Sequence, residues 1–395
     1  MASEVVIIGG GAIGLCCAHY LLADGHSVTV IERNGGRGGT SWGNAGMVVP
    51  SHFEPLANPG MLKLGLKMML NPEGPLGFGG LNPELLGWMR RFMSHATHEH
   101  VEATSQLILD LNLQSRELYR DLIGDKLSLT GMLMVCKTEN ALGGERTLAK
   151  TANKLGLATE ELDRFDLAKL GFDALGAIRF LDDAFLAPTT FLTNLRSNLL
   201  NQGVRIVEAD VKEINSSSVK TNSGAIGGDK FVLAAGAWSH RLVANLPLIP
   251  GRGYGFTVLN PPRSTENCAI LVEARVATTP MDDGQRFTGV MELGAYSSEP
   301  NPQKLDKIRT SIPEYLPAYE NHIFDEPVWV GHRPCSPDGL PYIGSFAGKP
   351  NLLAATGHGM MGMSLAPITG KLVSQLINDS PTSINIAKCS PNRFL

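Results

Sequence analysis

Apolar and polar positions in the first 32 residues follow the pattern of a strand, a helix and a second strand. The run "EVVIIG" (4–9) is almost wholly apolar and β-branched, as expected of a buried parallel strand. The run "AIGLCCAHYLLADG" (12–25) has the length of a helix, with small residues on the side that would face a sheet. "SVTVIE" (27–32) again has the pattern of a strand. Together these runs predict one βαβ unit.

The rest of the chain also alternates between helical and strand patterns. Apolar residues at a spacing of three to four predict helices over residues 83–96, 101–124, 189–203 and 301–317. Strands are expected over residues 127–138, 177–186 and 351–356, with a strand-rich region up to about residue 300 and a last helix to about Ile377. This order of elements is typical of an α/β protein with an inserted β-rich unit.

The turn between the first strand and the first helix carries the spacing G-x-G-x-x-G. Gly9 permits a tight turn, Gly11 permits close approach of the backbone to a pyrophosphate, and Gly14 permits close packing of helix and strand. The N–H groups of the helix start, at Ala12 and Ile13, would hold the phosphates. The position between strand and helix makes this a dinucleotide site.

Glu32 ends the second strand, eighteen residues after Gly14. A carboxylate in this place accepts hydrogen bonds from ribose hydroxyls and repels a 2′-phosphate. The expected dinucleotide is therefore FAD or NAD rather than NADP, and the motif alone does not choose between the first two.

A second G-x-G-x-x-G spacing occurs near the end of the chain, at Gly357, Gly359 and Gly362. A separate nucleotide unit would need a further strand that ends in an acid. Only 33 residues follow Gly362, and their run "SINIAK" is short and lacks such an acid. The second turn therefore cannot build a nucleotide domain of its own.

Composition narrows the class of protein. With 43% hydrophobic and 18% charged residues the chain is that of an ordinary globular protein, and a net charge of −4 gives no electrostatic case for nucleic acid. Six scattered cysteines without a C-x-x-C pair indicate reduced thiols and a cytoplasmic setting. No signal peptide precedes the first strand, and no apolar run is long enough to span a membrane.

Four further motifs carry a resemblance to a known family. They are "TSWGNAG" (40–46), "VKEI" (211–214), "VLAAGAWS" (232–239) and "GHRPCSPDGLPYIG" (331–344). With the first turn and "TGHG", they resemble the FAD-dependent D-amino-acid dehydrogenase and oxidase (DAO) family, in the family's order, and most of all its bacterial D-amino-acid dehydrogenases.

The resemblance implies that the cofactor is FAD. It places the cofactor against the first turn, the Thr/Ser-rich loop after the second strand, the adenine-contacting valine, the turn under the flavin and the second glycine turn. The expected contacts are Gly9, Gly11, Ala12, Ile13, Gly14, Glu32, Arg33, Thr40, Ser41, Asn44, Ala45, Gly46, Val211, Ala235, Gly236, Trp238, Gly331, Gly357, His358, Gly359, Met360 and Met361.

The resemblance also explains the second glycine turn. It would reach the flavin from the other side, with a helix that begins near Met360 and points its positive end at the N1–C2=O region. Negative charge develops there on reduction, so such a dipole would favour hydride acceptance.

The expected fold is a Rossmann-like FAD-binding domain made of discontinuous segments, with an inserted β-rich α+β substrate domain. We expect residues 1–60, 187–245 and 328–395 to form the FAD-binding domain. Residues 61–186 and 246–327 would form the substrate domain.

Three side chains are candidates for contact with the substrate. Arg333 matches the carboxylate-binding arginine of the family, and a bidentate guanidinium suits a carboxylate. Tyr254 matches a tyrosine that lines the pocket in some members, with a half-buried strand tyrosine as the alternative. His52 follows the flavin loop and is either a substrate contact or a structural histidine, and the role of His332 is equally open.

The resemblance implies oxidative deamination of a free amino acid, of the D series, by hydride transfer to flavin N5. D-Proline and hydroxy-D-proline are candidate substrates, and a quinone-type acceptor would take the electrons. The alternatives are a glycine/sarcosine-type oxidase that uses O₂ and a non-catalytic flavin-binding regulator. No metal site is expected, because no cysteine or carboxylate cluster completes a set with His95, His98 and His100.

The run "MLKLGLKMML" (61–70) has three interpretations. It is a lid over the substrate, a core helix, or a surface that rests on a membrane with Lys63 and Lys67 at the headgroups. The last interpretation would place the protein at the inner face of the cell membrane by peripheral contact. The oligomeric state cannot be read from the sequence.

Overall fold

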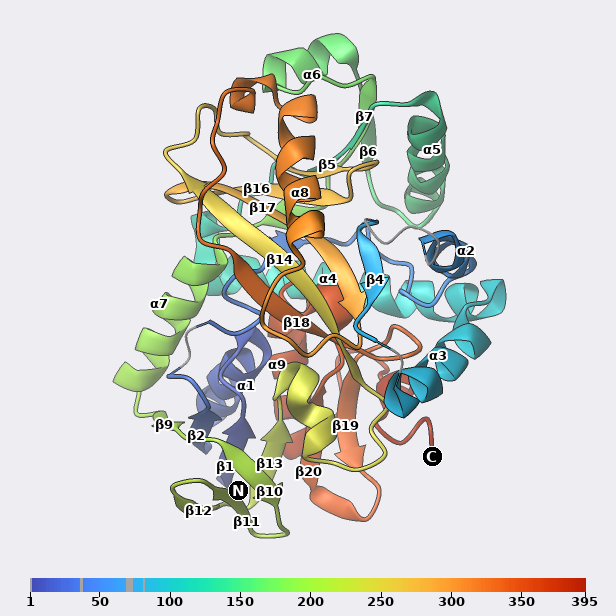
Figure 1. The fold of residues 1–395 in the computed structure, drawn as a ribbon. Coiled ribbons are helices and arrows are strands. Elements are labelled where there is room, and N and C mark those ends of the chain that lie inside the picture. The colour runs from blue at the N-terminus through green and yellow to red at the C-terminus, as the bar shows by residue number, and fades with distance from the viewer. Residues whose placement is uncertain (1, 36–37, 69–73, 81) are drawn as a thin grey trace.

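The computed structural model describes residues 2–35, 38–68, 74–80 and 82–395, apart from the side chains of residues 66–68 (Figure 1). A first sheet has six strands in the order β19-β20-β13-β1-β2-β9, parallel except for β19. Its strands are β1 (Glu4–Ile8), β2 (Ser27–Glu32), β9 (Arg205–Glu208), β13 (Lys230–Leu233), β19 (Tyr342–Phe346) and β20 (Lys349–Thr356).

The first sheet is buried because both of its faces are covered. Helices α1 (Ala12–Ala23) and α9 (Ala366–Ile377) pack on one face, beside α7 (Pro188–Asn201) and the long α4 (His98–Ile123). Small residues let α1 and α9 approach closely, since a Cβ atom at Gly370 would lie 2.6 Å from the carbonyl carbon and oxygen of Cys16. The strand–helix–strand unit predicted for residues 4–32 is confirmed.

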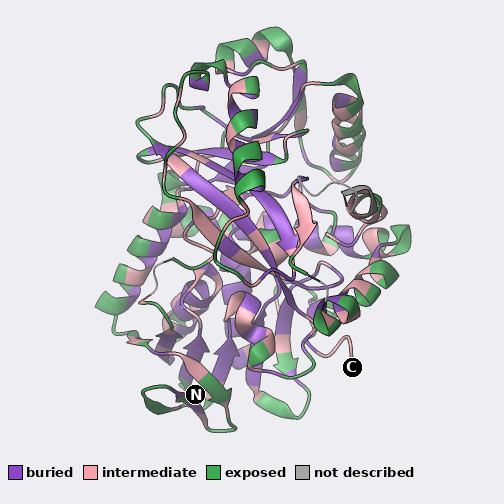
Figure 2. Cartoon of the chain, viewed as in Figure 1, coloured by how far each residue is buried: buried purple, intermediate pink, exposed green. Residues whose placement is uncertain are grey.

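A second, larger sheet lies above the first in Figure 1. Its path is β18-β14-β17-β16-β15-β5-β7-β6, and β4 (Leu76–Phe78) pairs with β17. The strands are β5 (Met132–Cys136), β6 (Thr159–Asp163), β7 (Gly176–Phe180), β14 (Ile249–Leu259), β15 (Cys268–Leu271), β16 (Val276–Met281), β17 (Gly284–Leu293) and β18 (Trp329–Cys335). Its long central strands are buried, whereas the helices around it expose their outer faces (Figure 2).

Smaller elements complete the fold. Strands β10 (Val211–Ile214), β11 (Ser218–Thr221) and β12 (Gly224–Gly227) form a separate sheet, and β3 (Met47–Val48) pairs with β8 (Ala184–Phe185). The remaining helices are α2 (Pro59–Met68), α3 (Pro83–His95), α5 (Glu139–Lys154), α6 (Arg164–Leu170) and α8 (Pro302–Tyr315).

Several sequence-based boundaries need correction. The strand predicted over residues 127–138 is limited to β5, and α5 and α6 were not foreseen. Helix α4 begins at His98 rather than at residue 101, because the Thr97 hydroxyl caps it by accepting from the His100 N–H. Strand β18 pairs with β14, so residues 329–335 lie in the second sheet.

No helix in the described ranges has the length and the apolar character that a bilayer span requires. Lys63 is exposed on α2, whereas Lys67 and residues 69–70 of the run "MLKLGLKMML" lie outside the described side chains.

Close packing of α1 on α9 generates a prediction. Gly370→Ala should lower the free energy of unfolding by about 1–3 kcal/mol, because the new methyl group collides with the Cys16 backbone. Gly144→Ala in α5 is the control: its Cβ atom meets nothing within 4 Å, so alanine should stabilise the protein by about 0.5–1 kcal/mol. Denaturant unfolding of both variants measures the difference, and equal effects would contradict it.

Candidate active site

The first glycine turn is built by direct contact between backbones. Gly9 has φ +113°, which favours glycine, and a Cβ atom at Gly14 would lie 1.8 Å from the Gly9 oxygen. The Gly10 N–H donates to Glu32 Oε2 at 2.6 Å. The turn thus brings the start of α1 to the carboxyl end of β2, where Glu32 lies.

Arg33 and Trp238 lie beside this edge. The Arg33 guanidinium is 5.2 Å from the centroid of the Trp238 ring, and the Arg33 N–H donates to Glu32 Oε1 at 2.9 Å. Val211 begins β10 just beyond the end of β9, where the Ala209 N–H donates to the Glu32 carbonyl. Predicted contacts from four separate stretches of sequence therefore gather where the parallel strands end.

The loop after β2 joins this edge to the second sheet. Ser41 Oγ accepts from the Ala12 N–H at 3.0 Å, while Thr40 Oγ1 donates to the His332 carbonyl at 2.9 Å. Arg286 donates to the carbonyl of Asn44 at 2.9 Å. Ala45 and Gly46 follow, and Asn44 Oδ1 accepts from the Gly46 N–H at 2.7 Å. Residues 36–37 of this loop lie outside the described residues.

Two glycines present backbone to open space at this edge. Gly236, after Ala235, has φ +56°, and Gly359 has φ +55°; a Cβ atom on either would meet nothing within 4 Å. Thr356 Oγ1 donates to the Gly236 carbonyl at 3.0 Å and so ties the two turns together. These open backbones fit the close approach of a flat cofactor.

Trp329 is a residue that sequence reasoning missed. Its indole would be 2.0 Å from a Cβ atom at Gly43 and 2.1 Å from one at Gly331. Within the described parts of the chain, its buried Nε1–H has no hydrogen-bond partner. An unsatisfied buried donor beside the cofactor loop is a further feature that fits a polar ligand there. The only signal in the sequence was its place two residues before Gly331.

The helix expected to begin near Met360 begins elsewhere. Residues Gly359–Met361 form one 3₁₀ turn, and α9 starts at Ala366 with Pro367 in its first turn. Proline is accommodated there because the first helical N–H groups have no partner to lose. The prediction of a helix dipole that begins at Met360 is therefore wrong. The turn presents its glycine backbone to a ligand at this edge.

His358 holds this turn in place. Its Nε2 lies 2.9 Å from Thr369 Oγ1 in α9, and burial lowers its pKa to about 3. The side chain of His358 is therefore neutral and structural, although its backbone stays at the turn. Gly357 has φ +79°, and Met360 is exposed, whereas Met361 packs against the first core and accepts through Sδ from Asn112 at 3.7 Å.

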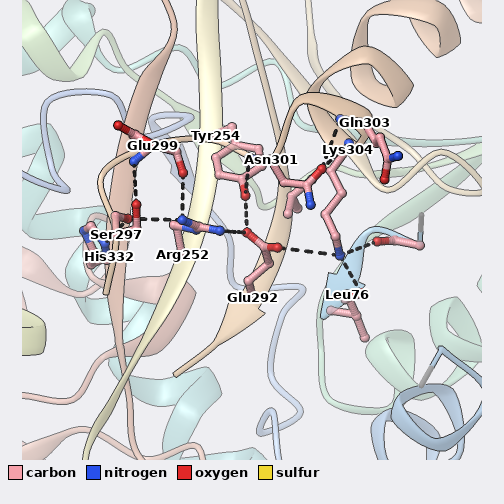
Figure 3. A network of polar contacts seen from close by, with 12 residues as sticks. Leu76, Arg252, Tyr254, Glu292, Ser297, Glu299, Asn301, Gln303, Lys304 and His332 are labelled. Atoms are coloured by element: carbon pink, nitrogen blue, oxygen red, sulfur yellow. Dashed lines mark hydrogen bonds and ion pairs between the residues drawn. The ribbon is translucent and has the colours of Figure 1, made fainter. Parts of the chain in front are cut away.

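Arg252 on β14 and Arg333 on β18 lie one register position apart and project to opposite faces of the sheet. Among the described residues, only Arg252 has an acidic partner. Arg252 donates to Glu292 Oε2 through Nε at 2.9 Å and Nη2 at 2.7 Å (Figure 3). Arg333 donates from Nη1 to the Val290 carbonyl at 3.0 Å and forms no ion pair with any described residue. Burial lowers the pKa of Arg333, yet it remains a cation at neutral pH.

Tyr254 lies in a buried polar cluster around Glu292 (Figure 3). Its hydroxyl donates to Glu292 and accepts from the Asn301 N–H at 3.0 Å, and burial followed by the bond to Glu292 raises its pKa to about 12. Lys304 completes the cluster, with Nζ 3.9 Å from Glu292 Oε1 and 2.8 Å from the Gly74 carbonyl. Both hydrogen-bonding functions of the Tyr254 hydroxyl are thus used inside the protein.

His52 lies at the end of a buried hydrogen-bonded chain. Its Nδ1 is 3.2 Å from Ser51 Oγ, and Ser51 donates to Asp183 through Oγ at 2.5 Å and through its N–H at 2.9 Å. Burial lowers the pKa of His52 to about 4 and raises that of Asp183 to about 7. No local pattern indicated this contact, because Ser51 and Asp183 are 132 residues apart in the chain.

The histidines considered for a metal lie apart from this edge. His95 Nδ1 is 2.8 Å from the Arg91 carbonyl, and His100 Nε2 is 2.8 Å from the Asp338 carbonyl. Across the described ranges, no three His, Cys, Asp or Glu side chains are grouped for a metal ion.

Comparison with known proteins identifies the group to which this arrangement belongs. The profile of the family described as "DAO: FAD dependent oxidoreductase" matches residues 4–376. A D-amino acid dehydrogenase of Helicobacter pylori is 28% identical, over 98% of this chain and 97% of its own. A D-amino-acid oxidase of Bradyrhizobium diazoefficiens is 29% identical, over 99% of both chains.

The same fold occurs in a solved structure. The crystal structure of glycine oxidase from Geobacillus kaustophilus superposes with a TM-score of 0.79 at 20% identity, over 99% of both chains. This confirms the expected fold class, a Rossmann-like sheet combined with a second, β-rich part.

Burial of Asp183 generates a prediction about pH. Its folded pKa, about 7, is raised from 3.8, so its stabilising contribution is present below pH 4 and is lost as the pH rises through 7. Relative to the wild type, Asp183→Asn should therefore gain about 2 kcal/mol in free energy of unfolding between pH 5 and pH 8. Denaturant unfolding at both pH values measures this, and a difference that does not change with pH would refute it.

Proposed function

The chain belongs to the DAO family of FAD-dependent oxidoreductases, and we propose that it oxidises a free D-amino acid to an imino acid that water hydrolyses to a 2-oxo acid. The observation that carries the proposal is Arg333. The half-buried guanidinium of Arg333 is partly withdrawn from water and favours an anionic partner, and the described residues offer it one carbonyl and no carboxylate. Its neighbour Arg252 already has Glu292. A substrate carboxylate would supply the missing anion.

The residues at the carboxyl edge of the first sheet are suited to hold FAD. The Ala12 N–H at the start of α1 already donates to Ser41, so the N–H groups that follow it would bind the diphosphate. Glu32 would bind the ribose hydroxyls, and the open backbones of Gly236 and Gly359 would lie against the ring system. The unpaired N–H of Trp329 offers one more donor. When bound, FAD supplies the acceptor for the hydride that leaves the substrate Cα.

His52 is suited to contact the substrate amino group. With Asp183 ionised, Ser51 donates its one hydroxyl proton to Asp183 and accepts from His52 Nδ1–H. His52 Nε2 then carries a lone pair, and the low pKa of this imidazole keeps it neutral. It would orient the amine by accepting a hydrogen bond.

Replacement of this imidazole tests the role. His52→Leu should lower kcat/KM roughly 10- to 100-fold, and an unchanged value would exclude this role.

Chirality and electron acceptor are proposed from the relatives. Most of the relatives reported above are named for D-amino acids, and we take D-proline or hydroxy-D-proline as candidate substrates on the sequence resemblance. The name dehydrogenase favours a quinone-type acceptor.

Peripheral membrane contact is also proposed, and exposed Lys63 on α2 is consistent with it. If the protein stays entirely in the soluble fraction when it is mixed with liposomes at low salt, this contact is excluded.

Two alternatives are distinguished by one experiment. The holoenzyme is mixed anaerobically with D- and L-amino acids, and the flavin absorbance is followed before and after air or a quinone analogue is added. We expect bleaching by D-amino acids and fast recovery with the quinone analogue. Fast recovery in air would indicate a glycine/sarcosine-type oxidase, and no bleaching by any amino acid would indicate a flavin-binding regulator.

Removal of the guanidinium tests the carboxylate site. Arg333→Leu should raise KM for amino acids by about two orders of magnitude, since it removes a charge-assisted, bidentate contact. FAD should stay bound, because Arg333 takes no part in the glycine turns. Steady-state kinetics and the visible spectrum measure both effects. A near-normal KM would refute the assignment.

A further inference from the structure

We propose that Gly253 and Val290 form a seat that positions the guanidinium of Arg333 for the substrate carboxylate. The proposal rests on the function proposed above and adds two positioning residues to it. One residue provides room for the guanidinium and the other provides an oxygen that orients it.

Gly253 provides the room. It lies on β14 opposite Gly331 of β18. Two residues earlier on β14, Gly251 lies opposite Arg333. A Cβ atom at Gly253 would lie 2.0 Å from Arg333 Nη1 and 2.6 Å from both Cζ and Nη2. The guanidinium therefore lies directly against the Gly253 backbone, and any side chain at Gly253 would displace it.

Val290 provides the oxygen, and it does so in a strained conformation. Its φ is +64°, a region that β-branched residues rarely adopt and that costs roughly 1–3 kcal/mol. Its carbonyl accepts from Arg333 Nη1 at 3.0 Å. Strain of this kind persists only where the surrounding structure imposes it, and it is concentrated at functional sites.

A bulge in the sheet explains why the Val290 carbonyl is available. Arg252 pairs with Glu292 and Tyr254 pairs with Gly289, so Val290 and Met291 together face Gly253 alone. The extra residue interrupts the ladder of hydrogen bonds between β14 and β17. The bulge therefore lies directly opposite the glycine on which the guanidinium rests.

Contacts on both sides hold the bulge in place. The Met291 N–H donates to the Pro75 carbonyl at 2.8 Å, which fixes the bulge to the strand segment at β4. Next to it, Glu292 is held by Arg252, Tyr254 and Lys304, as Figure 3 shows. The buried ion cluster thus acts on the substrate site through the backbone of β17.

In the part of the chain that the structure describes, the seat occupies only a small share of the donors of the Arg333 guanidinium. An arginine has five N–H donors, and Val290 uses one of them. A planar guanidinium fixed at one nitrogen presents its remaining donors in a defined direction, which is what bidentate binding of a carboxylate needs. Without the seat the cation would remain, but its direction would not be set.

Gly253→Ala is the direct test, because the clash falls on the far end of a flexible side chain and the strand can keep its path. KM for the amino acid and the Kd of propionate, measured from the flavin spectrum of the holoenzyme, should both rise roughly 10- to 100-fold. Gly255→Ala, on the same strand β14, is the control: its Cβ atom would lie 2.8 Å from Thr288 Cγ2 and 3.1 Å from the Phe287 carbonyl oxygen, both on β17, and not against Arg333. Equal KM values for the two variants would overturn the proposal.

Val290→Gly separates the carbonyl from the side chain. Glycine adopts positive φ without strain, so the bulge and its oxygen should persist and KM should stay within about twofold of the wild type. A tenfold increase would mean that the valine side chain is what matters and would overturn the seat.

Arg333→Leu distinguishes the two proposals. If it leaves KM unchanged, the carboxylate site itself is wrong and the seat is wrong with it. If it raises KM while Gly253→Ala does not, the carboxylate site stands and only the seat fails.

Discussion

One buried carboxylate, Glu292, organises the part of the second sheet that faces the cofactor edge. Because the Glu292 carboxylate is removed from water, its negative charge needs partners inside the protein. Arg252 and Lys304 supply positive charge, and the Tyr254 hydroxyl supplies a hydrogen bond. Removing one member of such a pair typically costs about 3–5 kcal/mol, because the remaining charge stays buried. This compensation distinguishes the two neighbouring arginines. Arg252 is paired with Glu292, whereas Arg333 on the adjacent strand β18 has no acidic partner among the described residues, and we propose that it meets the carboxylate of the substrate.

The two sheets are joined at the carboxyl edge of the first sheet, where the loop after β2 forms hydrogen bonds with β18. At the carboxyl edge of the first sheet, Gly9 and Gly14 touch without room for a side chain, while Gly236 and Gly359 face open space. The loop at Thr40 and Ser41 connects this edge to β18 by hydrogen bonds with His332 and Ala12. In the site that we propose, a cofactor held by the first sheet would face the strand that carries Arg333. The chemistry depends on this junction, and no single stretch of sequence contains it.

Local patterns were sufficient for the elements of the first sheet and for its glycine turn. The strand, turn and helix of residues 4–25 are predicted by apolar runs and by glycines at fixed spacing, and the structure has them where expected. The helix that the resemblance placed near Met360 begins instead at Ala366, with Pro367 in its first turn. The sequence left two roles open for Tyr254, because the partner of its hydroxyl, Glu292, is 38 residues away in the chain.

The sequence by itself determined the cofactor fold and the candidate arginine, because glycine spacing, strand pattern and the order of motifs are properties of neighbouring residues. Only the tertiary structure decided which of the two arginines pairs with Glu292 and how Asp183, Ser51 and His52 are connected. It also decided that Val290, opposite Gly253, adopts a positive φ that is unfavourable for valine. These features arise from burial and from pairing between distant strands. Desolvation and charge compensation depend on what surrounds a group in space, and that is set when the sheets close upon each other.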